Sequence, residues 1–256
     1  MILAVDIGNS NIVVGCMEGM NIVFEARVRT DATKTSDEYC IDLKNILDIY
    51  GVERSALEGA IVASVVPQVL NSIKTAIKKL TGKNSLVVGP GLKTGLNIKV
   101  ENPTQVGADL VVGAVAALRE HKPPMIVIDM GTATTMIVLD ETGAFIGGSI
   151  SPGVKISQDA LTNGTALLPG LQLDAPRKAI GRNTIDCMRS GIMLAHACMI
   201  DGMVERMEAE LGRKTTVVAT GGIARFVLPM CHTSILYDKD LLLKGLAYLY
   251  AENTRQ

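Results

Sequence analysis

The chain carries one short sequence design twice, and this repetition constrains its fold more than any other feature. Residues 5–11 read VDIGNSN and residues 128–134 read IDMGTAT, each after an apolar run typical of a buried strand. In both copies an Asp is followed two positions later by a Gly and then by small hydroxyl or amide residues. A second apolar run and a turn signal complete each copy. The repeated unit is therefore strand, acidic glycine loop, strand, and it predicts a duplicated chain.

The elements around the two copies follow the same order, which predicts an α/β fold. In the first half we expect strands over residues 2–6, 11–17, 21–30, 59–66 and 85–88, and helices over 36–50, 69–80 and 104–121. In the second half we expect strands over residues 125–129, 133–139, 144–150, 215–219 and 234–237, a long helix that follows Asn183 and Thr184 and runs to about residue 211, and a last helix from about 240. Ser36 is the expected N-cap of its helix. The Pro pair at 123 and 124 separates the halves, so we predict domains of residues 1–121 and 122–256.

Composition and charge argue against several classes of function. The 256 residues are 48% hydrophobic with no Trp and 3% aromatic side chains, so the core has to be aliphatic. The 25 basic and 26 acidic residues are spread along the chain, without the basic stripe or aromatic platform that nucleic acid requires. No apolar run has the length of a membrane span, and five scattered cysteines without a CxxC pair indicate free thiols in a reducing compartment. We therefore expect a cytoplasmic protein without a nucleic-acid or membrane partner.

The two acidic loops are the main candidates for chemistry. An Asp beside glycine and hydroxyl residues at a strand end can bind a magnesium-bound phosphate, because glycine lets the backbone approach and N–H groups bond the oxygens. One such loop alone is better explained as a β-turn, whereas two at corresponding places favour phosphate binding. Gly221 and Gly222, between a strand and a helix, either hold a planar base or ribose against bare backbone or form a tight turn.

Asp109 lies in the first turn of the helix expected over residues 104–121. A carboxylate there is favoured by the helix dipole without any function, and this setting should keep its pKa low. A weak base still serves phosphoryl transfer, because the attacking hydroxyl loses its proton late in a loose transition state. The position is compatible with a base without requiring one. His121, His196 and His232 show no metal-ligand spacing, so we expect them at the surface or the core edge.

Together these motifs resemble a known family. The acidic loops and the late Gly-Gly turn are similar to the actin, Hsp70 and sugar-kinase superfamily. Within it, the chain resembles the type III pantothenate kinases through DIGNS at 6–10, NPTQVGAD at 102–109, DMGTAT at 129–134, GGSISPG at 147–153, GRNT at 181–184 and TGG at 220–222. The resemblance spans the chain. It implies two duplicated actin/RNase H-like ATPase domains, residues 1–121 and 122–256, with an ATP cleft between them.

The resemblance also implies an activity, the ATP-dependent phosphorylation of the primary hydroxyl of pantothenate to 4′-phosphopantothenate, the first step of coenzyme A biosynthesis, by a homodimer. Gly107, Ala108, Asp109 and Leu110 would hold pantothenate, with Asp109 as the catalytic base, and Thr184 would reach the substrate across a subunit interface. Asp129 would bind a potassium or ammonium ion. The residues expected to bind ATP with Mg²⁺ are Asp6, Ile7, Gly8, Asn9, Ser10, Asn11, Ile12, Val13, Thr132, Gly221 and Gly222.

Two positions depart from the family pattern. The family commonly has Arg after Gly-Ala-Asp, where this chain has Leu110, and often has Tyr ahead of Asn-Pro, where this chain has Val100. These departures leave open another small hydroxylated or carboxylated substrate, which a substrate panel would test. A non-enzymatic ATP-binding regulator is a further alternative. The presence of all three acidic residues, Asp6, Asp109 and Asp129, argues against it.

Overall fold

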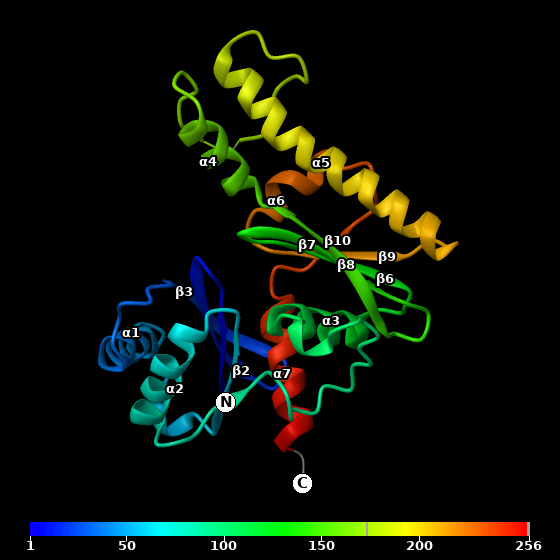
Figure 1. The fold of residues 1–256 in the computed structure, drawn as a ribbon. Coiled ribbons are helices and arrows are strands. Elements are labelled where there is room, and N and C mark those ends of the chain that lie inside the picture. Colours follow the sequence, from blue (N-terminus) through cyan, green and yellow to red (C-terminus); the bar gives the residue numbers. More distant parts are fainter. Residues whose placement is uncertain (173, 255–256) are drawn as a thin grey trace. The chain divides into compact units, whose positions relative to one another are not determined.

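The computed structural model describes residues 1–172 and 174–254, which form two compact units, each with its own sheet (Figure 1). The first unit comprises residues 1–96, 101–119 and the segment from residue 240 onward, and the second comprises residues 97–100 and 120–239. Each unit is therefore built from more than one segment of the chain, whereas the prediction divided the chain into two continuous domains after residue 121. No helix in the described part is long and apolar enough to cross a bilayer.

The first unit contains a mixed five-stranded sheet in the order β3-β2-β1-β4-β5. Its strands are β1 (Ile2–Ile7), β2 (Asn11–Glu18), β3 (Asn21–Arg29), β4 (Gly59–Ser64) and β5 (Leu86–Val87). β2 runs antiparallel to β1 and β3, while β4 runs parallel to β1 and β5. The helices of this unit are α1 (Ser36–Ile49), α2 (Pro67–Thr81), α3 (Ala108–Glu120) and α7 (Leu241–Thr254).

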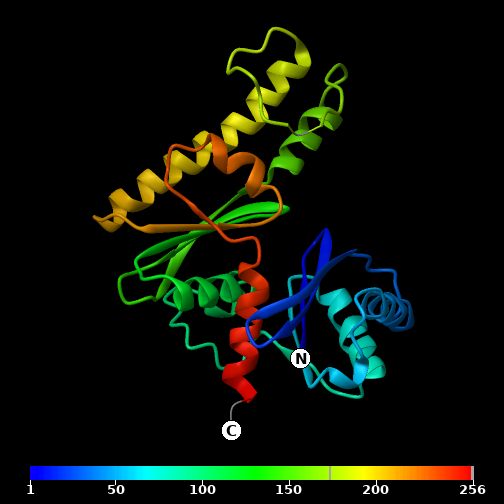
Figure 2. The same cartoon turned by 180° about the vertical axis from the view of Figure 1, so that it is seen from behind.

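Helices cover both faces of this first sheet. Helices α1 and α2 bury one face of β1, including Leu3 and Val5. Helix α7 packs on the other face, against β1 and β4 (Figure 2). A Cβ on Gly59 would overlap the Tyr250 hydroxyl, and one on Gly15 would lie 2.8 Å from Leu243 Cδ1. Glycine at these two strand positions therefore allows α7 to approach the sheet closely.

The second unit repeats the same sheet, in the order β8-β7-β6-β9-β10. Its strands are β6 (Met125–Met130), β7 (Ala133–Leu139), β8 (Phe145–Pro152), β9 (Thr216–Thr220) and β10 (Leu236–Tyr237). Its helices are α4 (Val154–Gly164), α5 (Thr184–Leu211) and α6 (Ala224–Val227). β6 pairs antiparallel with β7 and parallel with β9, as β1 does with β2 and β4. The core lies between this sheet and α5, where Ile126, Ile128 and Ile192 are buried.

The two central strands show how closely the units correspond. β1 and β6 have the same length and the same burial pattern, with four buried residues, a half-buried Asp and a final buried residue. The predicted α/β class and the predicted duplication are therefore confirmed. Each Asp is the next-to-last residue of its strand, so each acidic loop begins at the carboxyl end of a central strand.

Two predicted helix starts were wrong. The helix expected from residue 104 begins at Ala108, because residues 103–105 form a separate 3₁₀ turn and Val106 is extended. The N-cap of α1 is Thr35, not Ser36. The Thr35 hydroxyl accepts a hydrogen bond from the Glu38 N–H, and the Glu38 carboxylate accepts one from the Thr35 N–H at 2.7 Å. This reciprocal capping box stabilises the start one residue earlier.

Candidate active site

The first acidic loop connects β1 to β2 through residues 8–10. The Gly8 N–H donates to the Asn11 carbonyl at 3.0 Å, which closes the loop. Asp6 lies just before it, half-buried, between Val13 on β2 and Ala63 on β4. The predicted ATP-binding residues 6–13 therefore form one continuous strand end, loop and strand start.

The second acidic loop connects β6 to β7 through residues 131–132 and is one residue shorter. It is closed by a hydrogen bond from the Gly131 N–H to the Ala133 carbonyl at 3.0 Å. Asp129 is paired with Thr135 on β7 and with Thr220 on β9. Since paired residues on adjacent strands project to the same face of a sheet, these three side chains share one face.

Two glycines from other parts of the second unit pack against this second loop. Gly221 has φ +98°, and a Cβ there would overlap the backbone of Met130. The Gly153 N–H donates to the Thr132 carbonyl at 3.2 Å, and a Cβ on Gly153 would overlap that same carbonyl. The structure therefore brings Asp129, Thr132 and Gly221 together, and the close approach explains why glycine is required.

His196 is buried beneath this region, which corrects its predicted place at the surface or the core edge. Its side chain is 6% exposed, and its Nδ1 lies 2.7 Å from the Ile192 carbonyl. Its Nε2 lies 3.2 Å from the carbonyl of Pro152, the residue before Gly153. The sequence signal was weak, because a single His on a long helix has no distinguishing neighbours.

Asp109 occupies the second position of α3, in the first unit. Its Oδ1 accepts a hydrogen bond from the Leu110 N–H at 2.9 Å. A Cβ on Gly107 would overlap the same oxygen, so the carboxylate folds back over a bare backbone position. Burial raises the pKa of Asp109, and the backbone N–H bonds lower it by less. The direction is therefore opposite to the low pKa that we expected, because desolvation of the carboxyl outweighs its hydrogen bonds from backbone N–H groups.

Thr184 is the first residue of α5, in the second unit, and is exposed. The preceding Asn183 is the N-cap: its side-chain oxygen accepts from the Asp186 N–H at 2.9 Å, and its amide donates to the Asp186 carboxylate at 2.8 Å. A Cβ on Gly181 would overlap the backbone of Asp186 and Cys187. The start of α5 therefore explains the Gly and the Asn of the Gly-x-Asn-Thr motif, and Thr184 follows directly after the N-cap.

Oxygen atoms are the available cation ligands near Asp129. Among residues 1–172 and 174–254, no three His, Cys, Asp or Glu side chains converge as a metal cluster. The Thr135 hydroxyl, on the Asp129 face of the sheet, is buried and finds no hydrogen-bond partner in the described part of the chain. A carboxylate and a hydroxyl suit a hard cation that prefers oxygen and needs no multi-carboxylate cage.

Thr30 is a further residue at the first loop that the sequence pattern did not single out. Its N–H donates to the Ser10 carbonyl at 3.1 Å, and its hydroxyl donates to the Gly8 carbonyl at 2.7 Å. In the sequence it is only the last residue of an expected strand. The register of β2 against β3 is what places it beside the first loop.

Comparisons with known proteins agree with this fold and these motifs. The family model for type III pantothenate kinase matches residues 2–206. A type III pantothenate kinase of Exiguobacterium sp. is 44% identical over 255 residues, 100% of both chains. Another, from Moorella thermoacetica, is 42% identical over 254 residues, 99% of this chain and 100% of its own.

A solved structure shows the same fold at much lower identity. Component A of the (R)-2-hydroxyglutaryl-CoA dehydratase of Acidaminococcus fermentans is 16% identical, with a TM-score of 0.58 over 99% of both chains. The chain therefore shares its overall fold with this protein. With a family model that covers most of its length and relatives above 40% identity, this chain belongs to the type III pantothenate kinase family.

Proposed function

We propose that this chain transfers the γ-phosphate of ATP to the primary hydroxyl of pantothenate, giving 4′-phosphopantothenate in the first step of coenzyme A biosynthesis. The observation that carries the proposal is membership of the type III pantothenate kinase family along the whole chain. The test is phosphate transfer from ATP to pantothenate by the purified protein. ATP binding without transfer to pantothenate or to any related alcohol would contradict the proposal and favour the regulatory alternative.

Asp109 is the proposed base in this reaction. Burial raises the pKa of its carboxyl, so the carboxylate is a better proton acceptor near neutral pH than an exposed Asp. Its hydrogen bond from the Leu110 N–H fixes one oxygen. The second oxygen would then accept the proton of the pantothenate hydroxyl, with Gly107, Ala108 and Leu110 lining the pantothenate.

Residues 6–13 are the proposed contact with the ATP phosphates, and Thr132, Gly221 and Gly222 are the proposed contacts of the second unit with ATP. The arrangement supports this role, because Asp6 and the glycine of the first loop lie together at the end of a buried strand. Mg²⁺ held near Asp6 would neutralise phosphate charge during transfer. The protein's part is to hold the phosphates in line with the hydroxyl.

A monovalent cation, potassium or ammonium, is the proposed occupant beside Asp129. The carboxylate and the buried Thr135 hydroxyl are the donor atoms that support this assignment. Transfer should be faster in potassium than in sodium at equal ionic strength, and Asp129→Asn should lose most of that difference. Asp48→Asn is the control, because Asp48 forms an exposed ion pair with Lys44 within α1, in the first unit. Equal rates in both salts would contradict the cation site.

A homodimer is the proposed assembly, and exposed apolar side chains of the second unit support it. Ile150 on β8 is 75% exposed, and Ile180, four residues before Thr184, is 82% exposed. Ile156 and Leu161 on α4 are also exposed. Large exposed apolar side chains of this kind mark contact surfaces when they are contiguous. Thr184 of one subunit would then reach the pantothenate of its partner.

Sedimentation velocity tests this assembly. Ile180→Glu should shift the protein towards a monomer, whereas Ile49→Glu should not, although Ile49 on α1 is 77% exposed. A wild-type protein that sediments as a monomer at micromolar concentration would refute the homodimer.

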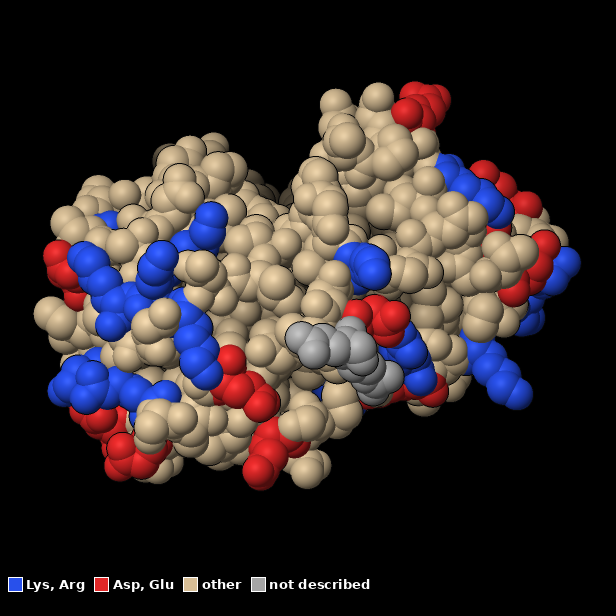
Figure 3. Space-filling model, turned by 90° about the horizontal axis from the view of Figure 1, so that it is seen from below, with Lys and Arg blue, Asp and Glu red and all other residues tan. Residues whose placement is uncertain are grey.

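A cytoplasmic location without nucleic-acid or membrane partners is the remaining proposal. All five cysteines are free thiols, which suits a reducing compartment. On the face in Figure 3, the basic side chains that gather on one side are bordered by acidic ones, and the other side carries both signs. Cell fractionation and filter binding to duplex DNA and RNA test this; specific binding at physiological salt would contradict it.

A related substrate is the second candidate, and Leu110 is the observation that favours it. Without the Arg that the family commonly has next to the base, a carboxylate-bearing substrate loses a potential partner. A panel of small hydroxy acids and hydroxy amides, compared by kcat/KM, separates the two candidates. Pantothenate as the best substrate would reject the second.

A further inference from the structure

The residue that follows β3, Thr30, is hydrogen-bonded to the first loop. Thr30 directly follows β3 and makes two hydrogen bonds to that loop, through its N–H to the Ser10 carbonyl and through its hydroxyl to the Gly8 carbonyl. Gly8 and Ser10 are two of the three loop residues. The carbonyl of one residue and the N–H of the next point in opposite directions across a trans peptide. Thr30 therefore sets the direction of the Asn9 N–H.

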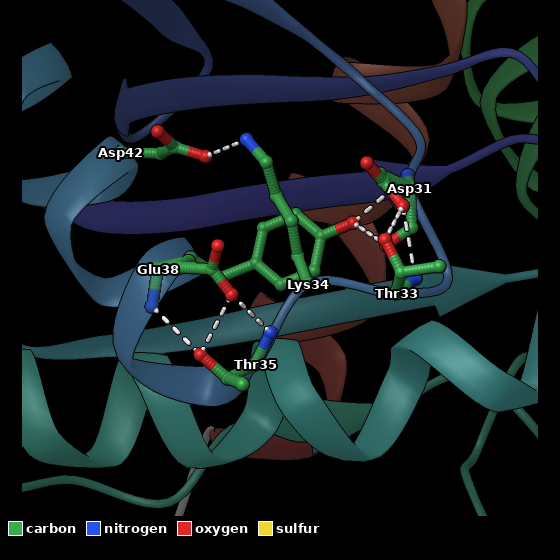
Figure 4. Close-up of polar contacts among 7 residues, drawn as sticks. Asp31, Thr33, Lys34, Thr35, Glu38 and Asp42 are labelled. Carbon is green, nitrogen blue, oxygen red and sulfur yellow. Dashed lines mark hydrogen bonds and ion pairs between the residues drawn. The ribbon is translucent and has the colours of Figure 1, made fainter.

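The position of Thr30 is in turn fixed through the next residue, Asp31, whose polar contacts are drawn in Figure 4. The next residue, Asp31, has both backbone groups bonded to one hydroxyl: the Tyr39 oxygen accepts from the Asp31 N–H at 3.0 Å and donates to the Asp31 carbonyl at 2.7 Å. The Tyr39 side chain is 1% exposed within the core beneath α1. Lys34 lies over its ring, 5.7 Å from the centroid. The first loop is thereby connected, through Asp31 and Tyr39, to α1 and the core of the first unit.

The second unit shows that the Thr30 hydroxyl bond is a special feature of the first loop. The register of β2 with β3 ends at Asn11 opposite Arg29, and that of β7 with β8 ends at Ala133 opposite Pro152. Thr30 and Gly153 follow Arg29 and Pro152, so they are equivalent, and both donate their N–H to the loop beside them. At Gly153, however, a Cβ would overlap the shorter loop. The extra residue of the first loop leaves room for a hydroxyl that bonds it.

We infer that Thr30 is a positioning residue for ATP: its hydroxyl holds the Gly8 carbonyl so that the Asn9 amide faces a bound phosphate. This inference rests on the proposed role of residues 6–13 in ATP binding. Thr30 acts through the loop and need not touch the nucleotide. Tyr39 supports the same arrangement from the core.

The test compares Thr30→Val, which keeps the shape and removes the hydroxyl, with Thr30→Ser, which keeps the hydroxyl. Thr30→Val should raise the KM for ATP and weaken ATP binding in calorimetry roughly five-fold, the usual effect of one lost neutral hydrogen bond. The KM for pantothenate should stay unchanged, and Thr30→Ser should bind ATP within about two-fold of the wild type.

Thr33→Val is the matched control, because its hydroxyl lies in the same segment but bonds the Asp31 carboxylate instead of the first loop. If Thr30→Val and Thr33→Val bind ATP with equal affinity, the inference is overturned, whatever the thermal stability of the two variants. A wild type that binds ATP but transfers no phosphate would refute the proposed function, while calorimetry would still decide the role of Thr30. A wild type that does not bind ATP would refute both.

Discussion

Gly153→Ala should damage the second acidic loop without straining the backbone of the mutated residue. Gly153 has φ −71° and ψ 164°, which alanine adopts freely, so the effect comes from the added methyl alone. Besides overlapping the Thr132 carbonyl, that methyl would lie 2.7 Å from the Gly131 oxygen and 2.9 Å from the Thr132 carbonyl carbon. Carbon prefers contacts near 3.5 Å, and the overlap with the Thr132 carbonyl oxygen is the tightest of the three, so the second loop has to retreat by roughly 1 Å.

The displacement allows two magnitudes to be worked out. A misplacement of about 1 Å at a reacting group costs about 100-fold, so kcat/KM for ATP should fall about 10- to 100-fold. Overpacking of this kind costs about 1–3 kcal/mol. For a chain of this size each kcal/mol lowers the Tm by about 2–4 °C. Activity should therefore fall much more than the folded fraction at 25 °C.

The assay is steady-state phosphate transfer over a range of ATP concentrations, with thermal unfolding measured on the same samples. Gly164→Ala is the control, because Gly164 ends α4 in the same unit and a Cβ there meets nothing within 4 Å. A Gly153→Ala enzyme with the kcat/KM of Gly164→Ala would refute the argument that the second loop is held by close backbone contact.

Three further outcomes are expected. Asp109→Asn should lower kcat by about 10²–10⁴-fold. It should also unfold at a higher temperature than the wild type at neutral pH, because burial raises the pKa of Asp109 and the ionised carboxyl therefore destabilises the fold. This advantage should shrink as pH falls through the raised folded-state pKa of Asp109 and be gone once pH reaches the lower unfolded-state pKa. Stability profiles that stay parallel from pH 7 to 3 would contradict this. Gly107→Ala should lower kcat about ten-fold or more, because its methyl group would displace the Asp109 carboxylate. Its Tm should be almost unchanged, because the displaced group is the end of a side chain and not backbone. An unaltered kcat would argue against Asp109 as the base. Burial raises the pKa of Cys231 to about 12, so its thiol is almost entirely protonated at pH 8. Iodoacetamide at pH 8 should therefore label Cys231 only after the protein is unfolded in urea, as measured by mass spectrometry. Rapid labelling of the native protein would contradict this burial.

The sequence predicted the fold to the extent that its signals were local. The two Asp-Gly loops lie between apolar runs, so both hairpins and the duplicated sheet could be predicted from periodicity. Asn183 caps α5, and an Asn just before a helical pattern is another local signal. At α1, Thr35 and Ser36 are both good N-caps, and only the reach of Glu38 decides between them.

Features that depend on distant contacts could not be predicted. The pKa of Asp109 depends on burial, which is absent from the sequence, whereas the helix dipole is visible in it. The contacts of Thr30 and Gly153 depend on the register of the third strand of each sheet. The buried place of His196 depends on the packing of α5 over the end of β8. The two acidic loops, the Gly221-Gly222 turn and Asp109 were singled out from the sequence pattern, whereas Thr184 was identified through the family resemblance, and the roles of all of them are predictions.

The packing of α7 on the first sheet also affects the order in which the protein can mature during translation. The strands of the first unit leave the ribosome early, but one face of that sheet stays uncovered until Leu243 and Tyr250 have been synthesised and can dock on Gly15 and Gly59. The second unit has by then emerged with all its strands and its long helix. The nascent chain must therefore keep an apolar surface of its earliest segment protected through almost the whole of its synthesis.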